Sequence, residues 1–451
     1  MTSPDASEVA TPAPRSRTGR FRWPARAACL MLTVPLGACD GCRHGDLAVA
    51  PSPSPAAPAD SGGSGDVAGE VDAAAEPALL EAVWSVPAGA RIVAVAFDDA
   101  RGVAVATSAG TVEVVDGDGV AATWGSDPRL ASTVALAWAP GAQGGLLAAT
   151  RGEEPVVARL GGAGAPVDVV YTLTGQPVDV RVDASGAVLV LRLLVHTEEG
   201  SALLTLHLAP EPVLSPSGDA AADAPGSGGA GPEGGAAEAG DGSGSSAGTG
   251  SVASLVDQHR LCAGAAGFFD VPGGHAVPCH DSQELVHLSW PTGGAESRTS
   301  LGFRPVAVVA VPGGLGVASA ATSEIAIQTV GAARLVPLDG PASALAAVGD
   351  DVVAASPGAS RLTRVTAGGE AAATSEAAAF PVAMAVSDAG LWVLDADLSH
   401  PRVLLLDPQT LTERASAPVG GRPAWVRVVG SGVVVVSPGE GLVERFELRD
   451  R

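Results

Sequence analysis

The fold is decided by residues 381–418, which read PVAMAVSDAGLWVLDADLSHPRVLLLDPQTLTERASAP. Three short apolar runs follow one another here: Val382–Val386, Leu391–Leu394 and Arg402–Leu406. Runs of four to seven apolar residues bounded by Gly, Pro or Asp are typical of β-strands. A polar segment, Glu413–Ala417, then leads to the next unit. The stretch is therefore one repeat unit built from short strands.

The same plan recurs along the chain about every 40 residues. A proline, usually with Gly shortly before it, precedes a strand at Pro305, Pro341, Pro381 and Pro423, which are 36, 40 and 42 residues apart. Pro177 fits the same frame once an insertion is subtracted. A period of about 40 residues with four short strands is typical of a β-propeller blade. The sequence therefore predicts an all-β protein with a propeller fold.

Counting units predicts eight four-stranded blades, which begin near residues 91, 132, 177, 264, 305, 342, 381 and 423. Seven is the alternative, if the region that carries the insertion forms one irregular blade. The last unit holds three strands, and an extra strand, Leu80–Val86, opens the folded region. We expect it to pair antiparallel with Leu442–Leu448 and to pack Val83, Trp84 and Val86 into the last blade. This pairing would leave the ring no open edge.

Two segments are rich in Gly, Ser, Ala and Pro with scattered acids: residues 39–79 and about 215–250. Neither can bury enough apolar surface to offset its ordering entropy, so we expect both to be disordered. The first would be a tether. The second would be a loop inserted into a propeller domain that spans residues 80–451.

The first 38 residues have the pattern of a secretion signal. Five arginines between positions 15 and 26 form a basic head, and Ala27–Leu36 is an apolar run too short to span a bilayer. The run ends in Leu36-Gly37-Ala38-Cys39, which resembles the lipobox of bacterial lipoproteins. That resemblance implies cleavage before Cys39 and a diacylglyceryl thioether on its sulfur. An ordinary signal peptide that happens to contain a cysteine is the alternative.

Two stretches of the unit quoted first carry a second resemblance: Val386–Val393, VSDAGLWV, and Val403–Leu411, VLLLDPQTL. They resemble the YVTN/NHL-type propeller repeat, a WD40-like repeat, although the Trp-Asp dipeptide of WD40 repeats is absent. The other units match it loosely. The resemblance implies the propeller fold and says little about function, because propellers host many activities.

Four residues invite a metal site or a disulfide. His275, Cys279 and His280 lie close together, with Cys262 upstream, but their spacing matches no standard zinc pattern. Aligning this blade with the next one places Cys262 just before an inner strand and Cys279 near the end of the following strand, at the same end of the blade. In an oxidising compartment this favours a Cys262–Cys279 disulfide. Two separate buried thiols are the alternative.

Inner strands line the axis of a propeller, where ligands usually bind. Arg181 and Arg427 both lie four residues after the proline of their unit, and Asp179 shares a strand face with Arg181. We expect these three residues to line the central channel. They would form either a polar ligand site or an ion pair satisfied by water.

No motif indicates catalysis or a cofactor. Cys39-Asp40-Gly41-Cys42 is followed by Arg43 and only then by His44, so it does not meet the c-type haem pattern. Gly-x-Ser-x-Gly occurs once, at 244–248 inside the insertion, and we interpret it as chance. Neither His-Glu-x-x-His nor a Walker loop is present. We predict no catalytic residue, no metal and no cofactor.

Charge bears on partners and location. The formal net charge is −23, and removing residues 1–38 takes away five Arg and two acids, which moves it to −26. The chain contains no Lys, so it lacks the basic patch that nucleic acid requires. We predict a monomer in the bacterial cell envelope, lipid-anchored to the inner or outer membrane, facing the periplasm or the surface, with envelope proteins as partners.

The predicted function is a non-enzymatic protein-interaction scaffold. The alternatives are a propeller that binds a small molecule or a glycan, and an enzyme of the lactonase or lyase type. Acids grouped at one mouth of the channel with bound calcium would favour the enzyme. An apolar or aromatic patch on one face would favour the scaffold.

Cys39→Ser tests the lipidation prediction. Without the thiol no thioether can form, so the precursor should keep its signal and carry no lipid. Mass spectrometry of the membrane-extracted protein measures both properties. Normal acylation or cleavage of the variant would contradict the assignment.

Overall fold

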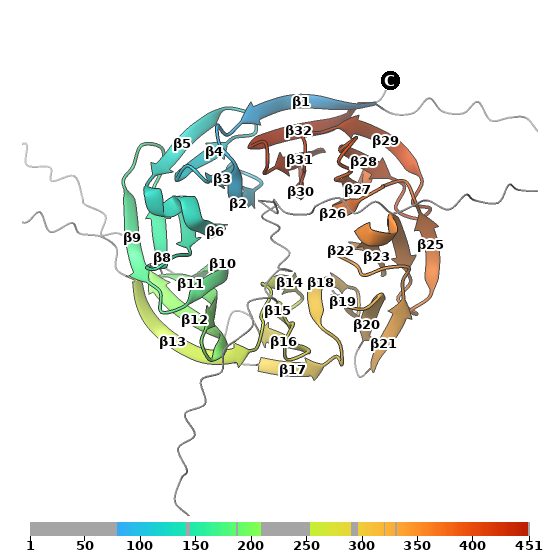
Figure 1. Ribbon diagram of the computed structural model, residues 1–451, viewed down its shortest axis with the longest axis horizontal. Coiled ribbons are helices and arrows are strands. Elements are labelled where there is room, and N and C mark those ends of the chain that lie inside the picture. Colours follow the sequence, from blue (N-terminus) through green and yellow to red (C-terminus); the bar gives the residue numbers. More distant parts are fainter. Residues whose placement is uncertain are drawn as a thin grey trace, which may run out of the picture. The chain divides into compact units, whose positions relative to one another are not determined.

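The computed structural model describes residues 79–449 apart from 141–144, 186–187, 209–252, 290–295, 320 and 330–331, all of them within one compact unit. They form eight four-stranded antiparallel sheets, arranged as the blades of a ring (Figure 1). The eight-bladed propeller is confirmed, and the seven-bladed alternative is wrong. The predicted signal, Cys39, the tether up to residue 78 and the insertion at 215–250 lie outside the described residues.

The blades follow one another in chain order. Blades 1 to 4 comprise β2–β5 (Ile92–Asp98, Gly102–Thr107, Thr111–Val115, Ala121–Ser126), β6–β9 (Thr133–Trp138, Leu146–Thr150, Val156–Leu160, Val167–Thr172), β10–β13 (Gln176–Ser185, Val188–Thr197, Gly200–Leu208, Ala253–Cys262) and β14–β17 (Phe269–Val271, Gly274–Cys279, Glu284–Ser289, Glu296–Ser300).

Blades 5 to 8 comprise β18–β21 (Pro305–Val311, Gly314–Ser319, Glu324–Thr329, Ala332–Pro337), β22–β25 (Ala344–Val348, Asp351–Ser356, Arg361–Val365, Ala371–Ser375), β26–β29 (Pro381–Ser387, Gly390–Asp395, Arg402–Leu406, Glu413–Pro418) and β30–β32 with β1 (Trp425–Val429, Gly432–Ser437, Leu442–Arg449, Leu79–Pro87). Two short 3₁₀ helices, η1 (Pro128–Ser132) and η2 (Pro357–Ala359), lie in connections.

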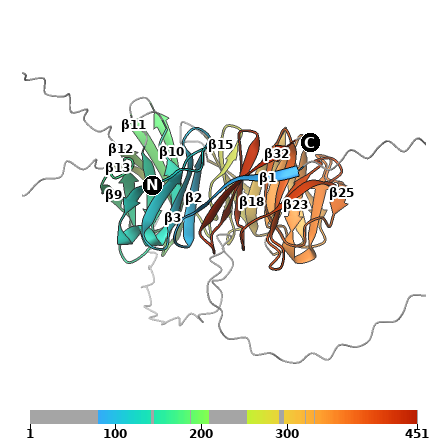
Figure 2. The same ribbon diagram turned by 90° about the horizontal axis from the view of Figure 1, so that it is seen from above.

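The first strand of each of these blades lies nearest the axis (Figure 1). Inner strands of neighbouring blades contact one another from β2 to β10 and from β14 to β30. Because the strands of a blade are antiparallel, the inner strands all run in the same direction through the ring. We call the face at which they begin the entry face. It carries the links between blades and the turns between second and third strands. The opposite face is the exit face (Figure 2).

The core lies between neighbouring blades and is mostly aliphatic, as a chain with 3% aromatic residues requires. Between blades 7 and 8, for example, Trp392 and Phe446 pack with Leu394, Val403 and Val433, and all five are fully or almost fully buried. Burying one such side chain stabilises the fold by about 1.5–3 kcal/mol. Each blade therefore depends on its two neighbours for its core.

The outer strand of blade 7 departs from the sequence prediction. Glu413–Ala417, predicted as a polar segment that leads to the next unit, belongs to β29, the fourth strand of blade 7. An outer strand faces solvent on its free side, so polar residues suit it. Blade 4 departs from the predicted frame too. Its inner strand β14 has three residues and begins at Phe269, after the predicted start near 264.

The ring is closed by the N-terminal strand, as predicted. β1 pairs antiparallel with β32, and Leu80 lies opposite Leu448 and Val86 opposite Val443. The expected packing of Val83 is wrong: a bulge between Ala82 and Trp84 turns it outward, and it is 45% exposed. The strand is held by buried Leu80 instead.

Trp84 adds a second contact for the closing strand. Its indole N–H donates to the carbonyl oxygen of Gly117 in blade 1, at 3.1 Å. Its ring lies against Gly119, which has a φ of +79°, and a Cβ there would come within 2.8 Å of the ring. The closing strand therefore also joins blade 8 to blade 1.

Truncation tests ring closure. A mature chain that begins at Gly89 loses β1, which exposes the backbone edge of β32 and removes Leu80 and Trp84 from their packing. We expect it to aggregate, or to melt roughly 5–10 °C lower in a thermal scan. A chain that begins at Glu76 keeps β1 and is the matched control. Unchanged melting and a monomeric state for the shorter chain would contradict this role of β1.

Candidate functional site

Two of the three predicted channel residues form an ion pair on β10. Arg181 Nη1 lies 3.1 Å from Asp179 Oδ1, and both side chains are partly buried. The same pair also bonds the neighbouring blade. The backbone N–H of Phe268 donates to Asp179 Oδ2 (2.9 Å), and Arg181 Nη2 donates to the Phe268 carbonyl oxygen (2.8 Å). Phe268 directly precedes the short strand β14. The pair thus attaches the inner edge of blade 4 to blade 3.

Other charges surround this pair. Arg181 Nε lies 4.0 Å from Asp270 Oδ1, and the same oxygen lies 3.0 Å from His275 Nδ1. The hydrogen bond from His275 lowers the pKa of Asp270, and the charges of Arg181 and Arg427 lower it further. Arg427 is exposed on β30 in blade 8, on the far side of the ring from β14 (Figure 1). It acts on the cluster through its charge.

Two more charged residues of blade 3 lie beside the pair. Arg192 faces Arg181 across the β10–β11 ladder and is 3% exposed. Burial lowers the pKa of Arg192 and raises that of Asp183, and the charges of these two residues oppose both shifts. The cluster mixes both signs: Arg192 is buried and Asp179 and Arg181 are partly buried, whereas Asp270 and Arg427 are exposed. The direct contacts of Asp179 and Arg181 with each other and with the backbone of Phe268 favour the interpretation as an ion-pair network over that as a ligand site.

Cys262 and Cys279 are joined in a disulfide, with their Cα atoms 6.0 Å apart. Cys262 ends the outer strand of blade 3 and Cys279 ends the second strand of blade 4, so the bond links two blades at the entry face. It closes a loop over a sequence separation of 17. A loop of about this length corresponds to roughly 3 kcal/mol of stabilisation in the chain-entropy model.

The two histidines near these cysteines bind carboxylates. His275 contacts Asp270, as described, and His280 Nδ1 lies 2.9 Å from Asp281 Oδ1. Over the part of the chain that the structure describes, no group of three or more His, Cys, Asp or Glu side chains could hold a metal ion. Within the same residues, no helix is long and apolar enough to cross a membrane.

One position recurs at the entry face of nearly every blade: the last residue of the second strand. A buried hydroxyl stands there in five blades, at Thr107, Thr150, Ser319, Ser356 and Ser437. Ser356 Oγ donates to Gly340 O at 2.9 Å, and Ser437 Oγ donates to Gly420 O at 3.1 Å. Each of these two bonds ties the second strand to the link from the preceding blade. In blade 4 the position holds Cys279, and in blade 7 it holds Asp395.

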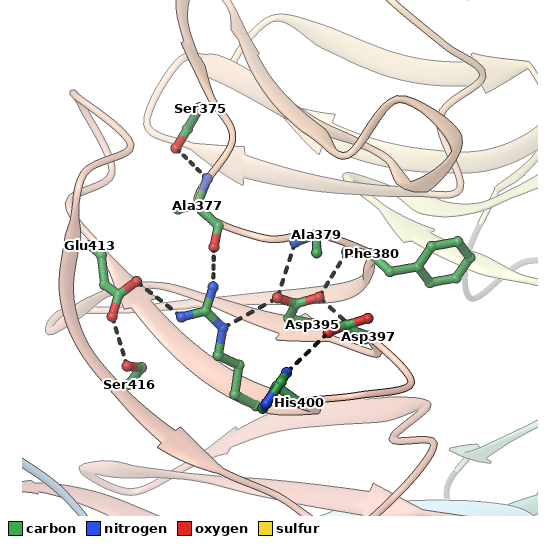
Figure 3. A network of polar contacts seen from close by, with 10 residues as sticks. Ser375, Ala377, Ala379, Phe380, Asp395, Asp397, His400, Glu413 and Ser416 are labelled. Carbon is green, nitrogen blue, oxygen red and sulfur yellow. Dashed lines mark hydrogen bonds and ion pairs between the residues drawn. The ribbon is translucent and has the colours of Figure 1, made fainter. Parts of the chain in front are cut away.

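Asp395 makes this tie far stronger than a hydroxyl does (Figure 3). Its side chain is 1% exposed and accepts backbone N–H bonds from Ala379 (3.0 Å), Phe380 (2.7 Å) and Asp397 (3.3 Å). Arg402 supplies the balancing charge, with Nε 3.3 Å from Asp395 Oδ2. Hydrogen bonds to a charged group are each worth about 1.5–3 kcal/mol.

Arg402 extends the network to both sides. Nη2 donates to the carbonyl oxygen of Ala377 at 2.5 Å, and Nη1 lies 3.4 Å from Glu413 Oε2 on the outer strand. His400 Nδ1 lies 3.8 Å from Asp397 Oδ2 (Figure 3). The inter-blade link before β26 and the turn after β27 are therefore held by one polar network.

These two segments display large apolar side chains. Phe380, at the end of the link, is 46% exposed, and Leu398, in the turn, is 81% exposed. The ring of Phe380 extends away from the carboxylate of Asp395 (Figure 3). The N–H groups of Phe380 and Asp397 bind the same oxygen, so the two segments lie side by side at the entry face. We call Phe380 and Leu398 the blade 7 apolar pair.

Sequence reasoning missed this pair and the network below it. One signal was present: a carboxylate, Asp395, at a position where other units have Ser or Thr. No sequence signal showed that Phe380 and Leu398 are exposed, because an apolar residue beside a strand can equally well be buried in the core.

No family model matches the chain, and no curated protein sequence matches it. Among solved structures the fold is similar to Sqt1 from Saccharomyces cerevisiae, at 9% identity and a TM-score of 0.54 over 83% of this chain and 100% of that one. It is also similar to the dihydro-heme d1 dehydrogenase NirN in complex with DHE, at 14% identity and a TM-score of 0.50 over 75% of this chain and 69% of that one. BamB from Moraxella catarrhalis has 14% identity and a TM-score of 0.48 over 82% of this chain and 98% of that one.

At such identities, the likenesses to Sqt1 and NirN show the propeller fold alone. The resemblance to the YVTN/NHL-type repeat stays a prediction.

Substitution of Asp395 tests the network. Asp395→Ala leaves three backbone N–H groups and Arg402 without this acceptor, and we expect a loss of about 2–4 kcal/mol of unfolding free energy. Asp395→Ser should lose less, because Ser occupies the same position in three other blades and can still tie the link. Chemical denaturation at pH 7 measures both. Equal losses for the two variants would contradict the proposed role of this position.

Proposed function

We propose that the protein is an envelope-anchored, non-enzymatic scaffold that binds another protein through the entry face of blade 7. The blade 7 apolar pair carries this proposal. Leu398 is the most exposed of the large hydrophobic side chains in the described residues, and Phe380 is the one aromatic side chain among them. Exposed aromatic and aliphatic side chains held in a fixed geometry are typical centres of protein interfaces.

The rigidity below the pair supports this role. The backbone of Phe380 and of the residue before Leu398 is bonded to a buried carboxylate. A partner that covers the pair therefore does not have to order these segments first, which lowers the entropy cost of association. The surrounding surface carries charges of both signs, among them Glu376 paired with Arg361 and Asp397 near His400, so a partner with an apolar centre and a polar rim would fit it.

The topology sets the face of the ring at which a tether would join it. β1 is antiparallel to β32, and it begins at Leu79 on the exit face and ends at Pro87 on the entry face. A lipid on Cys39, as the lipobox predicts, would connect to the ring at the exit face. The tether would therefore join the ring on the face opposite the apolar pair and leave the pair uncovered.

The double variant Phe380→Ser/Leu398→Ser tests the proposal. We expect the recovery of a cross-linked partner from native envelope to fall at least roughly tenfold, since interface centres contribute 2 kcal/mol or more. Val256→Ser/Leu335→Ser removes two other exposed apolar side chains, 53% and 49% exposed, from outer strands and is the control.

Quantitative mass spectrometry of the cross-linked proteins measures the recovery. If both double variants recover the same partners at the wild-type level, the blade 7 surface is not the binding surface.

A further inference from the structure

A pocket that the scaffold role does not use lies at the entry face, between blades 2 and 3. It has a volume of about 470 Å³, within the range of small-molecule sites. Its lining comes from the turn after β7, the link between β9 and β10, and the turn after β11. These three segments are neighbours on the left of the ring in Figure 1.

The lining combines apolar walls with acidic ends. Pro155 and Leu173 are buried and form an apolar wall, while Glu153 and Glu198 are exposed carboxylates contributed by two different blades. Thr174 adds a hydroxyl to the link between them. An aliphatic stem that ends in hydrogen-bond donors with a positive charge matches such a lining, because the stem covers the wall and the charge meets a carboxylate.

The turn that carries Glu153 is held in place by blade 3. The Gln176 side chain donates to Gly152 O (2.9 Å) and accepts from Gly152 N (3.2 Å). Arg151 Nε donates to Pro177 O at 3.1 Å. The carboxylate of Glu153 therefore projects from a turn whose two preceding residues are bonded to blade 3.

The turn that carries Glu198 is held by its own blade. Thr197 Oγ1 donates to Gly200 O at 3.0 Å, and His196 Nδ1 lies 2.7 Å from Ser201 Oγ. On the pocket floor, Leu173 N–H donates to Pro155 O at 2.8 Å. The pocket is thus formed before any ligand arrives.

The local charge is negative. Each of the two turns carries two adjacent carboxylates, Glu153 with Glu154 and Glu198 with Glu199. Asp281 adds a carboxylate that acts on His196. Three guanidinium groups lie nearby: that of Arg151, that of Arg260 beside Gly200, and that of Arg129, which interacts with Glu154. Five carboxylates against three guanidinium groups leave an excess of negative charge.

His196 does not change this balance. Burial and, to a smaller extent, the charge of Arg151 lower the pKa of its imidazole, so the ring is neutral at pH 7. The net charge of the whole chain, −23, also draws cations toward the protein.

We propose that this pocket binds an alkyl ammonium or guanidinium group, with Glu153 and Glu198 as its charge partners. Two sources offer that chemistry: a Lys or Arg side chain of a polypeptide, and a free linear diamine. The site is separate from the blade 7 apolar pair and does not depend on the scaffold function.

Titration calorimetry of the full chain with two probes tests the proposal and separates the sources. The probes are 1,5-diaminopentane and the blocked amino acid Nα-acetyl-lysine methylamide, with 1,5-pentanediol as a neutral probe of similar length. We expect one or both cations to bind with a Kd of roughly 0.1–1 mM and the diol to bind at least tenfold more weakly. The cation with the lower Kd identifies the source: a lower Kd for the diamine indicates a free diamine, and a lower Kd for the blocked lysine indicates a polypeptide side chain.

Glu153→Gln/Glu198→Gln should weaken binding of the cation about tenfold, because each exposed ion pair is worth up to a factor of about five. Glu154→Gln/Glu199→Gln makes the same charge change in the same turns, outside the pocket lining, and should weaken it less than twofold. Circular dichroism confirms that both variants fold.

Three results would overturn the site: neither cation binds at tens of millimolar, the diol binds as tightly as the cations, or both double variants weaken binding equally. The last result would mean that the cations respond to the general charge of the face and not to this pocket.

Discussion

The structure depends on the antiparallel pairing of β1 with β32. Seven blades receive four consecutive strands, but blade 8 lacks its outer strand until residues 79–87 return to it from the other end of the chain. Without them the ring would end in a three-stranded sheet with an open row of backbone donors and acceptors. Trp84 carries the closure into blade 1 through its bond to Gly117. One contact therefore closes the ring and also sets the face at which the N-terminal region joins it.

The seam between blades 3 and 4 shows how the ring tolerates irregular units. Blade 3 has strands of nine or ten residues, whereas the inner strand of blade 4 has three. So short a strand forms few ladder bonds, and other interactions replace them. Asp179 and Arg181 bind the backbone of Phe268, and the Cys262–Cys279 disulfide links the same blades at the entry face. The polar residues that suggested a channel site act mainly as this joint.

The blades differ at the entry face in one repeated position, the last residue of the second strand. A buried hydroxyl at the end of the second strand bonds the inter-blade link in blades 6 and 8, and the carboxylate of Asp395 bonds the link and the following turn of blade 7 through three backbone N–H groups, with an arginine beside it. A fully satisfied buried network holds its surroundings in one arrangement. Blade 7 can therefore keep Phe380 and Leu398 exposed without the loss of local order. At the pocket between blades 2 and 3, the side chain of Gln176 has a similar role, because it bonds the backbone of the turn after β7.

The sequence alone determined the repeat and the strand that closes the ring, because period, turn residues and an unpaired first strand are local features of the chain. It favoured eight blades over seven, and the structure decided that number. It also indicated Cys262 with Cys279 and Asp179 with Arg181, since alignment of the units places each pair at one end or on one face. Only the tertiary structure decided which side chains face solvent. The bulge that turns Val83 outward and the exposure of Phe380 and Leu398 arise from packing between strands far apart in the chain. Periodicity assigns a residue to a strand or a turn, but the neighbouring blade decides what covers it.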